Sequence, residues 1–191
     1  MTAIARRLHA AEPGWTARAD VIVVGSGIAG LTAALRARAI GRTVLLVTKA
    51  QVNEGSTRWA QGGIAAALSE DDSPEEHLHD TLVAGVGLCD EEAVRILVTE
   101  GPAAVRELIS TGARFDRDAS GAIALTREGG HLRDRIAHAG GDATGAEISR
   151  ALVAAVRDDA GIEVVENALA IDLLRDDLGA AQGVTLHVMG S

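Results

Sequence analysis

The sequence predicts an α/β fold with a parallel sheet. Two short aliphatic runs, at 21–24 and 43–48, are separated by a segment rich in alanine and leucine that suits a helix. The first run reaches Gly25 without polar alternation, which is typical of a strand buried on both faces of a parallel sheet. Strand, helix and second strand in this order predict a βαβ unit.

Glycines at the first strand–helix junction predict a dinucleotide-binding turn. Gly25, Gly27 and Gly30 have the spacing G-x-G-x-x-G. The first glycine permits the tight turn, the second lets a pyrophosphate approach the backbone, and the third lets the helix pack against the strand. Free N–H groups between Ser26 and Ala29 would then face the phosphates. A glycine-rich turn without a ligand is the alternative, and the flanking strand and helix disfavour it.

Composition limits the kind of protein. A chain of 191 residues can bury a sizeable core. A net charge of −9 disfavours sequence-independent binding of nucleic acid and binding of a membrane surface through a polybasic segment. The single cysteine, Cys89, excludes an intramolecular disulfide. No apolar run could span a bilayer, and no apolar signal-peptide core follows Arg6 and Arg7. We therefore expect a cytoplasmic protein with no stable membrane anchor, preceded by a flexible arm at 1–19.

The second strand ends at Lys49, which is the only lysine of the chain. An NAD-binding βαβ unit would carry an acidic residue there to hold the ribose hydroxyls, so a plain NAD-binding domain is disfavoured. Lys49 is either a solvated charge or a cation beside the ribose and phosphates of a cofactor. The following segment, 53–67, is rich in small, polar and glycine residues. It could wrap an extended ligand or form an ordinary surface loop.

Further elements follow in order. We expect a helix over 75–88 with apolar positions at Leu78, Leu82, Val83 and Val86, and a helix capped by Asp90 with a buried stripe of Ala93, Ile96 and Leu97. Pro102 should start a separate helix that ends at Gly112. His77 and His79 are two residues apart and do not share a helix face, so no metal site is expected.

The last third of the chain predicts two hairpins, a helix and a strand. The segment 115–125 suggests a hairpin with its turn at 118–121. A helix over 144–157 carries an apolar stripe of Ile148, Leu152 and Val156. The segment 162–166 should be a third strand of the nucleotide-binding sheet, and 168–175 with 182–188 should form an antiparallel hairpin.

Several motifs in succession resemble one family. They are Gly-Ser-Gly-Ile-Ala-Gly at 25–30, Lys49, Glu-Gly-Ser-Thr-x-x-Ala-Gln-Gly-Gly-Ile-Ala at 54–65, the block 79–90, Leu-Thr-Arg-Glu-Gly-Gly-His at 125–131 and Ala-Gly-Gly-Asp-Ala-Thr-Gly at 139–145. This succession resembles the fumarate reductase and succinate dehydrogenase flavoprotein superfamily, and within it the L-aspartate oxidases. The resemblance runs from about Asp20 to the C-terminus, which makes 20–191 the N-terminal portion of an FAD-binding domain.

The resemblance implies a Rossmann-like FAD-binding fold with a parallel sheet, helical insertions and an antiparallel hairpin, incomplete at its C-terminus. It implies FAD as the cofactor, with contacts at Gly25, Ser26, Gly27, Ile28, Ala29, Gly30, Lys49, Ser56, Thr57, Arg58, Trp59, Ala60, Gln61, Gly62, Gly63 and Ala170. Members that attach FAD covalently carry a histidine where Ser56 stands here. Because serine has no imidazole nitrogen, we expect a non-covalent flavin.

The resemblance also implies a substrate contact. Taken alone, Arg127, Glu128 and His131 would form a solvated charged loop. In aspartate oxidases the corresponding glutamate lies at the substrate site, where Glu128 would face the ammonium group of the amino acid. A carboxylate there would repel a dicarboxylate that lacks an amino group. Glu128 is therefore the expected specificity residue.

The implied reaction is FAD-dependent oxidation of L-aspartate to iminoaspartate, with O2 or fumarate as acceptor. Its product would feed quinolinate and NAD synthesis, with a hand-off to quinolinate synthase. The main catalytic residues of the family come later in its sequences, so this fragment is expected to be inactive alone. The alternatives are a dicarboxylate flavoprotein subunit of the succinate or fumarate type and a non-catalytic FAD-binding remnant.

Overall fold

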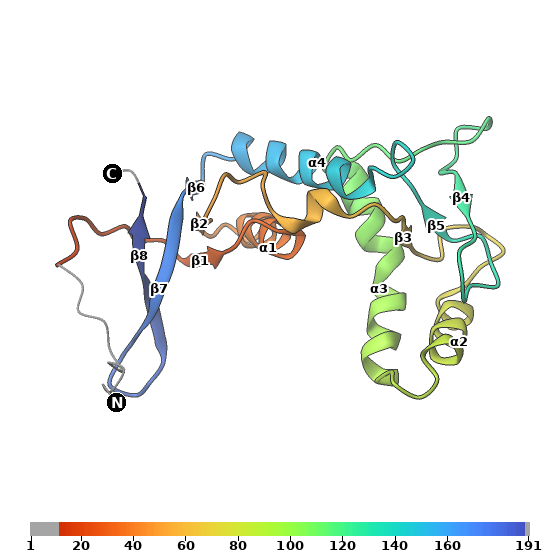
Figure 1. The fold of residues 1–191 in the computed structure, drawn as a ribbon, viewed down its shortest axis with the longest axis horizontal. Helices are drawn as coiled ribbons and strands as arrows, with labels where there is room; N and C mark the ends of the chain where they lie inside the picture. The colour runs from red at the N-terminus through yellow and green to blue at the C-terminus, as the bar shows by residue number, and fades with distance from the viewer. Residues whose placement is uncertain (1–11, 190–191) are drawn as a thin grey trace, which may run out of the picture.

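The computed structural model describes residues 12–189 and confirms the predicted α/β fold with a parallel sheet (Figure 1). Strands β1 (Val21–Val24), β2 (Val44–Val47) and β6 (Ile162–Val165) lie in the order β1-β2-β6. Both pairings are parallel, with Val44 opposite Val21 on one side and Ile162 on the other. The third strand therefore lies where the sequence predicts it.

Strand β2 is buried on both faces of the sheet. Val44 and Leu46 belong to the larger core, which α1 (Ile28–Ala39) and α4 (Thr144–Asp158) complete. Leu45 and Val47 belong to a smaller core on the other face. There they pack against the hairpin of β7 (Ala168–Arg175) and β8 (Ala181–Val188). The period-two alternation of a strand thus sends neighbouring residues into different cores.

Strand β1 is less buried than predicted, because it lies at the edge of this sheet. Val23 is 8% exposed and packs in the larger core, whereas Val24 is 57% exposed. Within residues 12–189, β1 pairs only with β2. The prediction of two buried faces for β1 is therefore wrong at Val24.

Two further helices lie outside the main sheet and pack against each other, and the second differs from the prediction. Helix α2 (Pro74–Gly85) begins at Ser73, whose hydroxyl accepts the Glu76 N–H at 3.1 Å. Helix α3 (Glu91–Ser110) begins at Asp90, as predicted, but continues through Pro102. A proline inside a helix removes one hydrogen bond. Pro102 is itself buried between Val98 and Val105, and the apolar area buried by this face offsets that loss.

The predicted apolar stripes of these helices are wrong at several positions. Val83 and Val86 are 64% and 85% exposed, and Ile96 and Leu97 are 55% and 69% exposed. Because α3 is continuous, its buried face is set by the stripe around Pro102. The connection between α2 and α3 instead extends away from the main sheet (Figure 1).

A second, small sheet lies at the opposite end of the molecule from the β7–β8 hairpin (Figure 1). Strands β3 (Ile64–Ala65), β5 (Ile136–Ala137) and β4 (Leu125–Thr126) form it in the order β3-β5-β4, and both pairings are antiparallel. The sequence did not predict this sheet, because two-residue strands are too short to show periodicity.

The predicted turn at 118–121 and the hairpin of 168–188 are both present. The Asp118 N–H donates to the Ala122 carbonyl at 2.9 Å, and Arg117 bridges to Ile123. Of the predicted arm, 1–11 lies outside the described residues, and 12–19 form neither helix nor strand. Ala17 and Ala19 nevertheless pack on the smaller core. No helix of the described chain is both long enough and apolar enough to cross a membrane.

Gly30 is required by close packing of α1 on the strand before it. A Cβ atom at Gly30 would lie 1.9 Å from the carbonyl oxygen of Gly25, whereas one at Gly27 would meet nothing nearer than the Thr57 hydroxyl at 3.7 Å. We therefore expect Gly30→Ala to lower the free energy of unfolding by about 1–3 kcal/mol, measured by urea denaturation. Gly27→Ala is the matched control and should change it little. Equal stability of the two variants would show that the close approach is not a constraint.

Candidate functional site

A groove of about 610 Å³ lies at the carboxyl ends of β1 and β2, where ligands bind in parallel α/β sheets. Six of the predicted cofactor residues line it: Gly25, Ser26, Lys49, Ser56, Trp59 and Ala170. Lys49 is exposed beside the groove. Thr48, Gln51 and Glu54 also line it and were not predicted. Their position after the end of β2, where ligands of parallel sheets bind, could have indicated that they line the groove.

The glycine turn is anchored to the sheet and presents free amides. The Gly25 N–H donates to the Val47 carbonyl at 2.8 Å, with Gly25 at φ 109°. The Ile28 N–H donates to the Thr57 hydroxyl at 2.9 Å. Within the described residues, the amides of Ala29 and Gly30 meet no acceptor. The start of α1 therefore offers donors to an anion, although the amide of Ile28 is already used.

The segment after the groove is a short 3-10 helix, η1 (Ser56–Trp59), rather than an extended loop. It packs against the start of α4, because the Gly145 N–H donates to the Ala60 carbonyl at 3.0 Å. The guanidinium of Arg58 lies 4.9 Å from the centre of the Trp59 ring, and Trp59 is 71% exposed. Among the predicted contacts, Arg58, Ala60, Gln61 and Gly62 are exposed outside the groove.

This segment connects the groove to the small sheet. Gly63 precedes β3 and touches β5, since a Cβ atom there would lie 2.3 Å from Ile136 Cγ2 and 3.0 Å from His138 Cε1. The predicted cofactor residues 56–63 thus begin at the groove and end against the strand that carries His138. An extended ligand that followed this segment would reach the small sheet.

Glu128 follows β4 and lies outside the groove. Its Oε1 is 3.3 Å from Nε2 of His138, and the Thr126 hydroxyl is 3.0 Å from the same nitrogen. The Glu128 side chain is 52% exposed, whereas that of His138 is 18% exposed. His138 was not predicted as a site residue. Its position directly before the Ala-Gly-Gly-Asp block at 139–142 gave no chemical signal.

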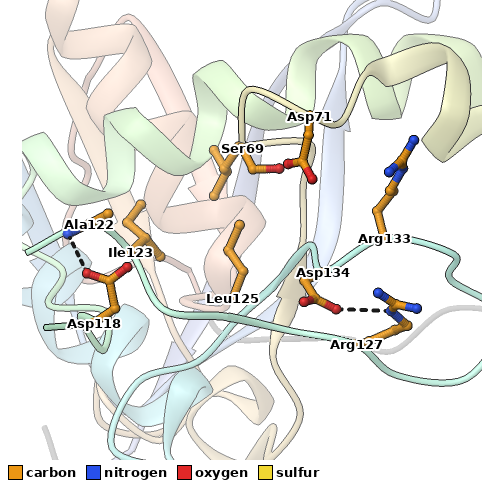
Figure 2. A pocket seen from close by; sticks show the side chains of 10 residues that line it. Ser69, Asp71, Asp118, Ala122, Ile123, Leu125, Arg127, Arg133 and Asp134 are labelled. Carbon is orange, nitrogen blue, oxygen red and sulfur yellow. Dashed lines mark hydrogen bonds and ion pairs between the residues drawn. The ribbon is translucent and has the colours of Figure 1, made fainter. Parts of the chain in front are cut away.

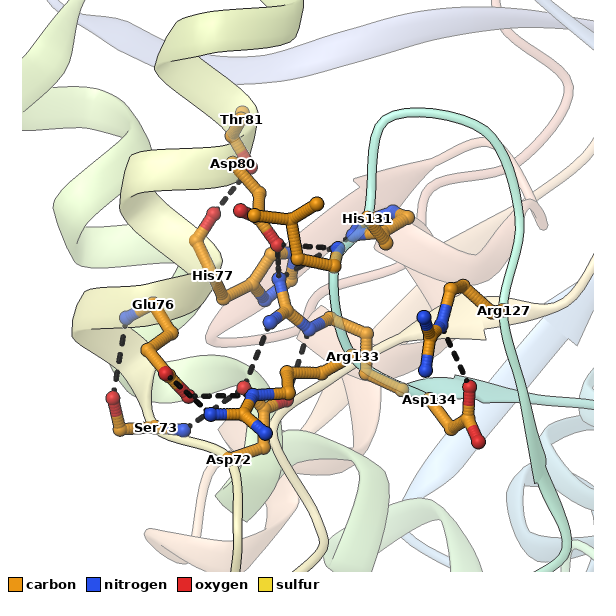
Figure 3. Close-up of polar contacts among 12 residues, drawn as sticks. Asp72, Ser73, Glu76, His77, Asp80, Thr81, Arg127, His131, Arg133 and Asp134 are labelled. Atoms are coloured by element: carbon orange, nitrogen blue, oxygen red, sulfur yellow. Dashed lines mark hydrogen bonds and ion pairs between the residues drawn. The ribbon is translucent and has the colours of Figure 1, made fainter.

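A buried arginine cluster, defined by Arg135, Asp72 and Asp80, holds the base of the Glu128 loop (Figure 3). Arg135 is 0% exposed and donates to both oxygens of Asp72 at 2.9 and 2.7 Å and to Asp80 at 2.9 Å. Asp80 also accepts the Leu132 N–H at 2.9 Å. These charge-assisted bonds tie the loop to α2 and to the turn before it.

Burial and charge pairing shift the pKa of Asp80 in this cluster in opposite directions. Burial alone would raise the pKa of Asp80, but the Leu132 amide and the Arg135 guanidinium outweigh it and hold that pKa below its ordinary value. Burial lowers the pKa of His77, and Arg135 and His131 lower it further. His77 Nδ1 is buried without a hydrogen-bond partner in the described chain. His77 is therefore kept in its neutral form.

The other charged side chains of the loop face a second cavity, of about 440 Å³ (Figure 2). Arg127 Nε lies 3.0 Å from the Asp134 carboxylate, and both side chains are more than half exposed. Arg133 pairs with Glu76 of α2 at 2.9 Å. The Arg127 side chain thus contacts Asp134, and the His131 side chain contacts Arg135. Neither side chain forms a hydrogen bond or ion pair with that of Glu128 in the described structure.

Comparison with known proteins gives the class. The model of the family described as "FAD binding domain" matches residues 20–190, and the chain belongs to that family. The site fits the cofactor: a glycine turn with no room for a side chain at Gly30, two free amides and a groove beside them. FAD is therefore the cofactor of this fold. The resemblance of the sequence motifs to those of an FAD-binding flavoprotein family is confirmed.

Relatives narrow the class further. L-aspartate oxidase of Streptomyces coelicolor is 68% identical over 190 residues, which cover 100% of this chain and 33% of that protein. L-aspartate oxidase of Mycobacterium tuberculosis is 50% identical over 169 residues, covering 87% and 31%. The chain thus spans about a third of the length of the curated relatives it matches.

Solved structures agree on the fold. Mycobacterium smegmatis Sdh1 in complex with UQ1 superposes with a TM-score of 0.83 at 35% identity, covering 89% of this chain and 30% of that one. A FrdA variant of E. coli quinol fumarate reductase gives a TM-score of 0.81 at 31% identity, covering 88% and 29%. These likenesses confirm the predicted flavoprotein fold.

The buried arginine cluster should dominate the stability of the Glu128 loop. Arg135→Met would leave two buried carboxylates without their cation, and we expect a loss of about 3–5 kcal/mol in the free energy of unfolding. The matched control is Arg127→Met, which removes an exposed pair on the same loop and should cost less than about 1 kcal/mol. Urea denaturation measures both. Similar losses would show that Asp72 and Asp80 do not depend on Arg135.

Proposed function

We propose that the chain is the N-terminal portion of an FAD-dependent L-aspartate oxidase, which converts L-aspartate to iminoaspartate. The supporting observation is that His138 lies beside Gly63, at the end of the segment that leads out of the groove, and that Glu128 lies beside His138. The identity of 68% to a protein of that name supports the same activity. In this proposal residues 20–191 belong to the FAD-binding domain.

The proposed cofactor position follows the chain from β1 to β3. The free amides of Ala29 and Gly30 would hold the diphosphate, with Lys49 near its negative charge. Ala170 would lie near the adenine, and the segment 56–63 would run along the flavin. FAD supplies the hydride acceptor for the reaction, and the protein supplies binding, orientation and electrostatics.

Glu128 would recognise the feature that separates aspartate from other dicarboxylates. Its carboxylate attracts an ammonium group and repels a substrate that carries only negative charge. A negative group fixed beside the Cα–H bond would also orient that bond. Binding and orientation are thus the contribution of this chain's own residues to the reaction.

Further parts of the proposal concern the complete protein. O2 or fumarate would accept the electrons, and the likeness to a quinol fumarate reductase supports fumarate. Iminoaspartate would pass to quinolinate synthase for NAD synthesis, and a cytoplasmic location stays a prediction. The 191-residue chain alone is expected to show no useful turnover, because it spans about a third of its relatives.

One alternative has a specific observation in its favour. A dicarboxylate flavoprotein subunit would agree with the structures superposed at 31–35% identity. Glu128 argues against it for the electrostatic reason given above. A non-catalytic FAD-binding remnant is the second alternative, and turnover of aspartate by the longer protein would eliminate it.

We expect the flavin to be held without a covalent bond, because Ser56 lacks the nucleophilic ring nitrogen needed for attachment. Acid precipitation of the holoprotein should leave flavin fluorescence in the supernatant. Ser56→Ala should release the flavin in the same way. Fluorescence that stays with the denatured polypeptide would contradict this expectation.

Glu128→Gln should weaken aspartate oxidation far more than fumarate reduction. Losing a charged contact of about 1.5–3 kcal/mol corresponds to a fall of about 10- to 100-fold in kcat/KM for aspartate. Fumarate reduction by the flavoprotein should change by less than about threefold. Asp134→Asn is the matched control, because Asp134 lies on the same loop but faces the second cavity (Figure 2). Equal losses with aspartate and fumarate would remove the assignment.

A further inference from the structure

The Glu128 side chain needs an external support. It lies on a loop next to Gly129 and Gly130, with Gly130 at φ 85°, and half of its surface is exposed. A long side chain in such a loop loses conformational entropy when it is held in one position. A recognition carboxylate that samples several rotamers would bind an ammonium group less tightly. A neighbour that fixes it therefore has a functional consequence.

His138 is placed to give that support. It follows β5 directly, and its carbonyl accepts the Asp116 N–H at 2.8 Å, so its backbone is fixed on two sides. Its ring is close to Gly63, where a Cβ atom would lie 3.0 Å from Cε1. The ring is thus held between the small sheet and the segment 56–63, and only its Nε2 edge faces the Glu128 loop.

The polar edge of His138 meets two groups of that loop. Nε2 lies 3.3 Å from Glu128 Oε1 and 3.0 Å from the Thr126 hydroxyl. A neutral imidazole carries one hydrogen on this nitrogen at most, so the Thr126 hydroxyl is its hydrogen-bond partner and Glu128 Oε1 makes a polar contact at 3.3 Å. Oε2 of Glu128 is left to accept from another group. A lysine or arginine at this place would compete with a substrate ammonium for the carboxylate.

We propose that His138 is a positioning residue for substrate recognition, which holds the Glu128 carboxylate beside the segment 56–63 so that it can bind the ammonium group of an amino-dicarboxylate. The inference rests on the proposed function, because it needs Glu128 to contact the substrate. It adds that recognition depends on a polar contact with a residue that follows a different strand and lies against Gly63.

The test uses the complete flavoprotein with His138→Leu and His138→Gln. Leucine removes the polar contact, whereas the glutamine amide can place an N–H near the position of Nε2. The measured quantities are kcat and KM for L-aspartate, the inhibition constant of succinate, which has no ammonium group, and FAD affinity by fluorescence titration. His79→Leu, at an exposed position of α2, is the control.

We expect His138→Leu to raise the KM for aspartate about 10-fold, with kcat, succinate inhibition and FAD affinity each within about twofold. His138→Gln should restore KM to within about threefold. Combining His138→Leu with Glu128→Gln should raise KM little beyond Glu128→Gln alone, because the two residues act as one unit. A glutamine variant as impaired as the leucine variant would overturn the proposal, as would equal losses for aspartate and succinate.

Two further outcomes separate this inference from the proposed function. An unchanged aspartate KM in Glu128→Gln would reject the role of Glu128 itself. A large effect of Glu128→Gln with no effect of His138→Leu would reject only the role of His138. If His138→Leu loses FAD, the comparison is His138→Asn with His138→Gln. Both variants place an amide at this position, but only the glutamine amide reaches the position of Nε2. An identical KM for aspartate in the two variants would overturn the proposal.

Discussion

Enclosure of one guanidinium between two carboxylates determines where the part of the domain that carries Glu128 and His138 lies. Arg135 and Asp72 are both fully buried, so their charges interact without the screening that weakens surface pairs. Because Arg135 immediately precedes β5, this contact fixes the strand that carries His138 and, through pairing with β4, the strand that leads to Glu128. The positions of Glu128 and His138 therefore depend on an interaction in which neither takes part.

The cofactor half depends on backbone rather than on charge. The strand–helix turn is closed by the bond from Gly25 to Val47, and α1 lies so close to the turn that only glycine fits at position 30. The chain from η1 to β3 joins this half to the small sheet. An extended dinucleotide with a diphosphate in its middle and a reactive ring at one end matches a protein built of two anchored ends and a connecting segment.

The sequence predicted the parts of the fold whose chemistry is local. Gly25, Gly27 and Gly30 predicted the turn, and the aliphatic runs at 21–24 and 43–48 predicted strands β1 and β2. Pro102 was misread as a helix start, because its burial beside Val98 is a tertiary effect that outweighs local propensity. His138 could not be found from sequence, since its partners come from β4 and from the segment near Gly63, and only the folded chain brings them together.

The hydroxyl of Thr57 occupies the first amide of α1, a place that a ligand oxygen takes in many anion sites. The protein thus supplies its own acceptor there, and this bond aligns η1 with the glycine turn. A scaffold that is already arranged before loading gives up little disorder on binding. Removing the Thr57 hydroxyl would then slow or weaken flavin uptake through the loss of this alignment.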